Sequence, residues 1–162
     1  MGSTRSADVV VIGAGQAGLS AAYHLQRRGL EPYDGFVVLD ANAGPGGAWQ
    51  HRWPSLTMRD VHGVAALPGT AAPDPPDAER ASQAVPGYFG AYEREFALPV
   101  LRPVRVHAVT DEPGDELTVH TDGGTWVARA LVNATGTWRQ PFVPYYPGTE
   151  RFRGRQLHTV EY

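Results

Sequence analysis

Three glycines near the amino terminus have types and spacing that could bind phosphate. Gly13, Gly15 and Gly18 form a G-x-G-x-x-G pattern directly after the apolar run Val9–Ile12. The first glycine of such a pattern allows a tight turn, the second lets the backbone approach a pyrophosphate, and the third lets a helix pack closely on its sheet. The helix amino terminus adds free N–H groups for the phosphates. The pattern predicts a dinucleotide-binding turn, and a glycine turn without a ligand is the alternative.

An acidic residue stands where a dinucleotide ribose would be expected. Asp40 follows the apolar run Phe36–Leu39 and lies 27 residues after Gly13. The usual interval is about 20 residues, and the turn-rich segment before the second run accounts for the excess. An acidic residue here accepts hydrogen bonds from ribose hydroxyls and disfavours a 2′-phosphate, so it favours FAD or NAD over NADP. A carboxylate that merely caps the strand end is the alternative.

The elements that would position these residues form a βαβ unit. Val9–Ile12 and Phe36–Leu39 are short β-branched or apolar runs, typical of strands buried on both faces. Between them, Leu19–Arg28 has apolar residues at helical spacing, and Gly29 is suited to end the helix. This unit by itself does not separate FAD from NAD.

The rest of the chain predicts one more helix and a small meander. The segment 67–86 is rich in proline, which indicates an extended connection, and a helix is expected from Pro86 because proline suits a first helical turn. An irregular, proline-rich tail is expected over 141–162. Strands are expected at Val104–Val109, Glu116–Thr121, Thr125–Ala130 and Leu131–Gly136, the first three forming an antiparallel meander.

Composition excludes several kinds of chemistry. The 162 residues contain no cysteine, and all 14 basic residues are arginine, so there is no lysine. Disulfides, thiolate nucleophiles, cysteine-bound metals and Schiff-base lysines are therefore excluded. The six histidines have no spacing typical of a metal site, and none is expected.

Charge and hydropathy limit the partners. The formal net charge of −3 provides no basic field for nucleic acid. No apolar run approaches the roughly 18 residues of a membrane span, and no signal peptide is recognisable. We therefore expect a cytoplasmic chain with one domain over 1–162, with no nucleic-acid or membrane partner. Assembly into a homo-oligomer stays open.

Five further motifs follow one another along the chain, at Gly46–Trp49 with Arg52–Leu56, Leu67–Gly69, Tyr88–Val100, Val132–Gly148 and Phe152–Tyr162. In this order they resemble the flavin-containing monooxygenase superfamily, which includes the Baeyer–Villiger and the plant auxin-synthesis monooxygenases. The resemblance covers nearly the whole chain.

This resemblance implies a fold and a reaction. The fold would be α/β, a Rossmann-like βαβ dinucleotide-binding fold with a small antiparallel β-meander, as the FAD-binding part of a two-domain flavoprotein. The family oxygenates small organic substrates at nitrogen, sulfur or a carbonyl through a C4a-(hydro)peroxyflavin, with FAD as cofactor and NADPH as reductant. NADPH would need a second glycine fingerprint, and this sequence contains only one. No catalytic residue is assigned.

The resemblance also implies a set of FAD-binding residues. The glycine turn would hold the pyrophosphate, and Asp40 the adenosine ribose. Ala48 and Trp49, in the loop Gly44–Trp49 (the tryptophan loop), would pack along the flavin portion. Val106 would meet the adenine, and Ala134–Gly136 would close the pocket. The full set is Gly13, Gly15, Gln16, Ala17, Gly18, Asp40, Ala41, Gly47, Ala48, Trp49, Arg52, Val106, Ala134, Thr135 and Gly136.

Three other functions remain open from the residues alone. The chain could be a stand-alone FAD- or NAD-binding module, a truncated non-catalytic fragment, or an NAD-dependent oxidoreductase with one Rossmann domain. The absence of lysine argues against the short-chain reductase version of the last, because that chemistry uses a Tyr-x-x-x-Lys pair.

Overall fold

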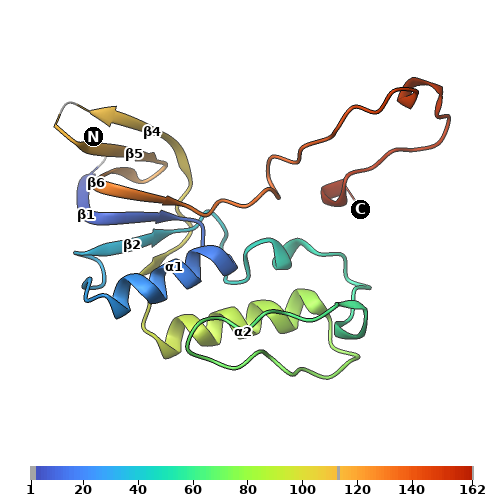
Figure 1. Ribbon diagram of the computed structural model, residues 1–162, viewed down its shortest axis with the longest axis horizontal. Coiled ribbons are helices and arrows are strands. Elements are labelled where there is room, and N and C mark those ends of the chain that lie inside the picture. Colours follow the sequence, from blue (N-terminus) through green and yellow to red (C-terminus); the bar gives the residue numbers. More distant parts are fainter. Residues whose placement is uncertain (1–2, 113, 162) are drawn as a thin grey trace.

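A computed structural model describes residues 3–112 and 114–161, which build one six-stranded sheet with two α-helices (Figure 1). The strand order is β3-β2-β1-β6-β5-β4, and both helices lie on the same side of the sheet in Figure 1. The elements are β1 (Ser3–Ile12), α1 (Gln16–Arg27), β2 (Phe36–Leu39), α2 (Ala81–Glu95), β3 (Val100–Leu101), β4 (Val106–Glu112), β5 (Glu116–Thr121) and β6 (Gly124–Asn133). The expected α/β fold with a small meander is confirmed.

The parallel half of the sheet is built around β1. This strand pairs in parallel with β2 on one side and with β6 on the other, and β2 pairs in parallel with β3. All four residues of β2 are buried, as expected for a strand covered on both faces. Helix α1 begins at Gln16, three residues before the expected start, because the last residues of the glycine pattern are already helical.

Strand β6 corrects the sequence analysis. Two separate strands were expected at Thr125–Ala130 and Leu131–Gly136, but the structure has one strand, Gly124–Asn133. Its first half pairs with β5 in an antiparallel hairpin, and its whole length pairs with β1. The continuity depends on β1, which extends back to Ser3 through residues too polar to predict a strand. The meander strand expected at Val104–Val109 is likewise shifted to Val106–Glu112.

Helix α2 is the second correction, because it begins at Ala81 rather than at Pro86. Pro86 therefore lies inside the helix, where it cannot donate a hydrogen bond to the preceding turn. Its ring faces the loop residue Gly46, and a Cβ atom at position 46 would lie 2.6 Å from Pro86 Cγ. This close packing holds the amino-terminal part of α2 against the loop that follows β2.

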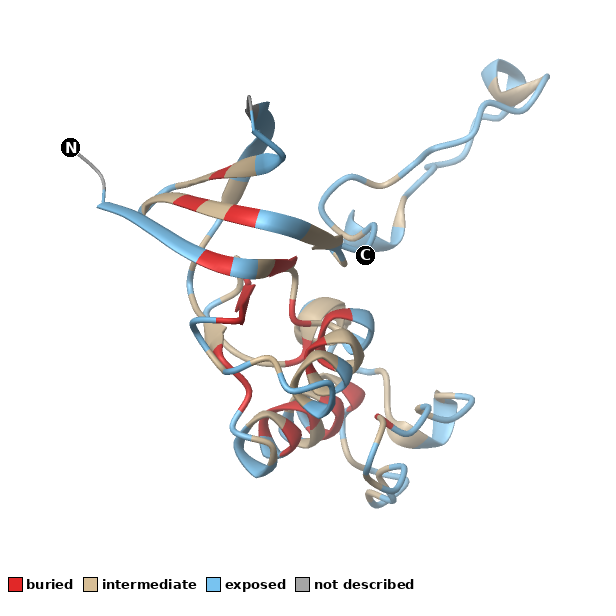
Figure 2. Ribbon diagram, turned by 60° about the vertical axis from the view of Figure 1, so that its left-hand side comes forward, coloured by how far each residue is buried: buried red, intermediate tan, exposed pale blue. Residues whose placement is uncertain are grey.

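Two apolar clusters cover the two faces of the sheet. The larger one joins Val11, Phe36 and Val38 of the sheet to buried residues of α1 and α2, among them Tyr92. The hydroxyl of Tyr92 donates to the carbonyl of Pro68 at 2.7 Å, and burial raises its pKa, so that it remains a donor. The second cluster joins the opposite face of β1 and β2 to the meander. Figure 2 shows these buried residues within the sheet and helices.

A partly buried ion pair joins α2 to the segment after β3. Arg102 Nη1 and Nη2 each donate to one carboxylate oxygen of Glu93 at 2.7 Å, and each side chain is only 12% exposed. The Arg102 Nε atom is buried without a hydrogen-bond partner in the described part of the chain. The pair thus depends on two good hydrogen bonds to compensate for the burial of two charges.

We expect Glu93→Leu to lower the free energy of unfolding by about 3 kcal/mol, because it leaves the Arg102 guanidinium buried without its partner. The double variant Glu93→Leu with Arg102→Met should cost less than this single replacement, since no charge remains buried. Denaturant unfolding followed by circular dichroism measures both values. A double variant that loses more than the single one would contradict this account.

The carboxyl-terminal tail lies away from the sheet and helices (Figure 1). Apart from two short 3-10 helices, Thr149–Arg151 and Thr159–Glu161, it is irregular, as expected. None of its described residues is buried, and its large apolar side chains include Phe142 at 81% exposed. Among the helices of the described residues, none is long and apolar enough to cross a bilayer.

Candidate functional site

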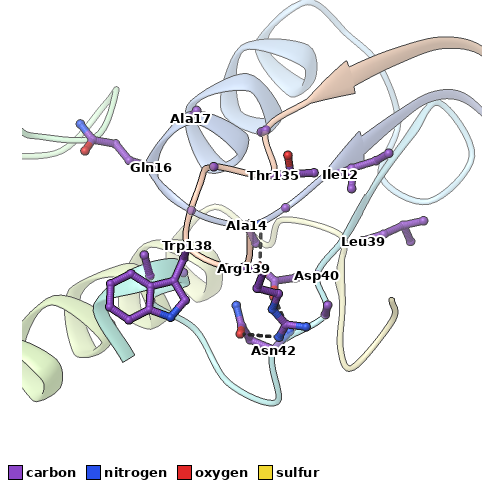
Figure 3. Close-up of a pocket in the computed structure, with 18 of the residues that line it drawn as sticks. Ile12, Ala14, Gln16, Ala17, Leu39, Asp40, Asn42, Thr135, Trp138 and Arg139 are labelled. Atoms are coloured by element: carbon purple, nitrogen blue, oxygen red, sulfur yellow. Dashed lines mark hydrogen bonds between the residues drawn. The ribbon is translucent and has the colours of Figure 1, made fainter. Parts of the chain in front are cut away.

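A cavity of about 650 Å³ opens at the carboxyl ends of β1, β2 and β6 (Figure 3). Its lining comes from the glycine turn, the loop after β2, the start of the meander and the segment after β6. Open parallel sheets bind ligands at this edge, and the volume lies within the range of small-molecule sites. The cavity is therefore the candidate site.

The glycine turn carries the chain from β1 into α1 without side-chain bulk. Gly13 has φ +98° and donates its N–H to the Leu39 carbonyl at 2.8 Å, which continues the sheet pairing into the turn. A Cβ atom at Gly18 would lie 1.8 Å from the Gly13 carbonyl oxygen, so the helix can approach the turn only with glycine there. At Gly15 a Cβ atom would meet nothing within 4 Å. Gly15 lines the cavity and precedes the first residue of α1.

Asp40 connects the glycine turn to the loop after β2. The residue is 3% exposed, and it is the only buried charged residue among those the structure describes. One carboxylate oxygen accepts the backbone N–H of Ala14, and the other accepts that of Asn42, each at 2.7 Å. A carboxylate accepts about four hydrogen bonds, so each oxygen keeps capacity for a ligand hydroxyl.

The tryptophan loop forms another wall of the cavity. Residues Gly47–His51 form a short 3-10 helix that begins within this loop. Trp49 lines the cavity, whereas Arg52 does not. The Arg52 guanidinium carbon lies 5.5 Å from the centre of the Trp49 ring, so Arg52 can act on the cavity through that ring.

The structure brings most of the expected site residues together. Two of them, Gly18 and Arg52, lie outside the lining. Gly18 packs against Gly13, and Arg52 lies over the ring of Trp49, and both of these partners line the cavity. The residues that line the cavity are Gly13, Gly15, Gln16, Ala17, Asp40, Ala41, Gly47, Ala48, Trp49, Val106, Ala134, Thr135 and Gly136.

A polar and aromatic group that was not predicted from the sequence lines the same cavity. Asn42 and His51 come from the loop after β2, and Trp138 and Arg139 follow β6. Trp138 and Arg139 belong to the Val132–Gly148 motif, but nothing in that motif indicates their partners. Arg139 contacts Asn42, 97 positions away in sequence, and such a pairing has no local pattern.

Comparison with known families defines the class of protein. The family described as pyridine nucleotide-disulphide oxidoreductase matches residues 10–161, and this chain belongs to that family. Since the chain has no cysteine, it cannot itself carry the disulphide chemistry in the family's description.

Individual relatives place the chain near the flavin monooxygenases. A solved flavin-containing monooxygenase from Stenotrophomonas maltophilia is 45% identical, with a TM-score of 0.77 over 98% of this chain and 47% of its own. An FAD-dependent monooxygenase of Pyrenophora dematioidea is 31% identical over 94% of this chain and 30% of its own. A cyclohexanone monooxygenase from Rhodococcus sp. Phi1, solved with NADP⁺, is 25% identical, with a TM-score of 0.67 over 99% and 31%.

These similarities confirm the resemblance to the flavin-containing monooxygenases that the motifs indicated. The chain spans less than half the length of the curated relatives and of the solved structures named above. Any activity of a whole monooxygenase is therefore only proposed for this chain.

Proposed function

We propose that this chain binds FAD in the cavity and is the FAD-binding part of a flavin-dependent monooxygenase. The observation that carries the proposal is the meeting of three features in one cavity: the glycine turn, the buried carboxylate of Asp40, and Trp49. The first two match the diphosphate and ribose of a dinucleotide, and the flavin monooxygenases among the relatives indicate which dinucleotide. When bound, the flavin would supply the redox and oxygen-transfer chemistry.

Each part of the cavity would have its own task. The N–H groups at the start of α1 and around Gly15 would bind the diphosphate. Asp40 would accept hydrogen bonds from the ribose hydroxyls through the lone pairs that Ala14 and Asn42 leave free. Val106, at the start of the meander, would contact the adenine, and Trp49 would pack along the flavin portion. These residues bind and orient the cofactor and exclude water from it.

We further propose that NADPH, the organic substrate and the oxygenation step need residues outside this sequence. The 162 residues contain one glycine fingerprint, and the residues 1–162 would act as a single FAD-binding domain. The substrate would be a small organic molecule oxygenated at nitrogen, sulfur or a carbonyl. A location in the cytoplasm belongs to the same proposal.

A ligand series tests the FAD proposal on the purified chain. FAD, FMN, NAD⁺ and ADP-ribose are titrated separately, with binding followed by calorimetry and, for the flavins, by fluorescence. FAD should bind at least tenfold more tightly than FMN, because FMN lacks the adenosine that Asp40 would hold. It should also bind more tightly than ADP-ribose, which lacks the flavin. NADPH oxidation by this chain should not exceed that of free FAD.

Three outcomes would contradict the proposal. Tighter binding of NAD⁺ than of FAD would favour a nicotinamide-dependent oxidoreductase. Equal binding of FAD and FMN would show that the adenosine end is not recognised. A folded chain that binds none of the four ligands would leave the cavity without a nucleotide.

A further inference from the structure

The segment that follows β6 crosses the candidate site. Residues 137–140 all line the cavity, although the last residue of β6 is Asn133. In Figure 3 the side chains of Trp138 and Arg139 lie beside the loop that carries Asp40 and Asn42. We call residues 137–140 the strap, because side chains of the loop after β2 hold it there.

Trp138 makes the first attachment of the strap. Its ring stacks on the imidazole of His51, with centroids 5.9 Å apart and planes inclined by 17°. The Arg52 guanidinium carbon lies 5.0 Å from the centroid of the same Trp138 ring, a cation–π distance. Arg52 also lies over the Trp49 ring, so the strap and the tryptophan loop share one guanidinium.

Arg139 makes the second attachment. Its Nη2 atom donates to the side-chain carbonyl oxygen of Asn42 at 3.1 Å, and His51 Nε2 lies 3.1 Å from the same oxygen. The backbone N–H of Asn42 donates to Asp40. The strap is therefore tied to Asn42, whose backbone N–H donates to the carboxylate that would hold the ribose.

The residues that attach the strap belong to neither of the two apolar clusters that pack on the sheet. Arg139 and His51 are exposed, and Trp138 and Arg52 are half-buried. Single ring, cation–π and polar contacts of this kind are individually weak, so the strap can open while the rest of the chain stays folded. A segment that is weakly attached across a ligand cavity fits a role in admitting and retaining the ligand.

We propose that the strap is a retaining element: its closure over the bound dinucleotide slows dissociation of the cofactor. This inference rests on the proposed binding of FAD and adds the residues that control its release. Trp138 and Arg139 act as positioning residues, which hold the strap through His51, Arg52 and Asn42. Opening of the strap precedes release, so weakening the attachments raises the dissociation rate without lowering the association rate.

The test measures FAD release from the full chain. The loaded protein is diluted, and the recovery of flavin fluorescence gives the dissociation rate. Trp138→Ala removes two ring contacts and should raise this rate about tenfold, and Arg139→Gln should raise it about threefold. Trp138→Phe keeps a ring in place and should release FAD more slowly than Trp138→Ala. Arg129→Gln, an exposed β6 position outside the cavity lining, makes the same charge change and should leave the rate unchanged.

A double variant separates the strap from a direct contact with the ligand. If Arg139 acts by holding Asn42, then Asn42→Ala should have little further effect on the rate once Arg139→Gln is present. Unchanged release in both Trp138→Ala and Arg139→Gln would overturn the strap, as would a loss of association rate with release unaltered. Whether the parent chain binds FAD at all, measured by the amplitude of binding, tests the proposed function. The strap is tested separately, by comparing release rates among the chains that bind FAD.

Discussion

Replacing Gly18 by alanine is expected to lower the free energy of unfolding by at least about 3 kcal/mol and to abolish dinucleotide binding. The added Cβ atom would lie 1.8 Å from the Gly13 carbonyl oxygen and 2.9 Å from its carbonyl carbon. Both atoms belong to the backbone of the turn, and no side-chain rotation can relieve the contact. The start of α1 would have to move away from β1, which would open the larger apolar cluster and displace the N–H groups at the cavity.

Gly15→Ala is the matched control, because it adds the same methyl group three residues earlier. There the Cβ atom would meet nothing within 4 Å, and φ is −82°, which any residue adopts. We expect a cost below about 1 kcal/mol, mainly from alanine as a poorer N-cap than glycine. FAD affinity should nevertheless fall at least tenfold, since the methyl group occupies the space where the diphosphate must approach the backbone.

Denaturant unfolding and FAD titration of both variants give the comparison. The free energy of unfolding should fall much further in Gly18→Ala than in Gly15→Ala, whereas FAD binding should be impaired in both variants. Equal stability of the two variants would contradict the role of Gly18 in helix packing. Full FAD affinity in Gly15→Ala would place the diphosphate elsewhere.

Asp40→Ala should also cost at least about 3 kcal/mol, because it leaves two backbone N–H groups without their acceptor. The carboxylate accepts from Ala14 and from Asn42 at 2.7 Å each, and it is 3% exposed, so water does not readily replace it. Removal of this group frees the glycine turn from the loop after β2. FAD binding should be lost together with this connection, both through the ribose and through the shape of the cavity.

Two further variants, Asp40→Asn and Asp8→Ala, distinguish the loss of the two N–H contacts from the loss of a carboxylate as such. The asparagine oxygen can still accept one N–H while its amide meets the other donor, so Asp40→Asn should be intermediate in stability. Asp8 is an exposed carboxylate of β1, and Asp8→Ala should leave the free energy of unfolding within about 0.5 kcal/mol of the parent. If Asp40→Ala were as stable as Asp8→Ala, the two N–H contacts would not support the turn.

Several elements could be predicted because their causes are local. Phe36–Leu39 agrees with β2 residue for residue, since four consecutive apolar residues between a turn and an acidic residue predict a buried strand. Gly29 follows α1 with φ +88°, as a helix-ending glycine should. Most of the expected site residues meet in the cavity for the same reason: turns and strand ends of a parallel sheet converge at one edge.

The errors have their causes in distant contacts. Helix α2 begins at Ala81, whose backbone N–H donates to the distant Leu56 carbonyl. Pro86 is accommodated inside the helix against Gly46, 40 positions earlier in the chain. Strand β6 is one continuous strand because β1 runs alongside its whole length, from Ser3 beside Gly124 to Ile12 beside Asn133. Gly124 approaches β1 so closely that a Cβ atom there would lie 2.3 Å from the Ser3 carbonyl oxygen. Neither partner can be recognised from the residues of the element itself.

The amino-acid sequence alone determined the βαβ unit, the glycine turn and the family resemblance, because each depends on residue types within a short stretch. Only the tertiary structure decided that Asp40 holds the turn through Ala14, and that Trp138 and Arg139 lie against His51, Arg52 and Asn42. Those contacts arise where β6 leaves the sheet next to the loop after β2. The pairing of strands brings such segments together, and no local pattern of residues records which side chains meet there.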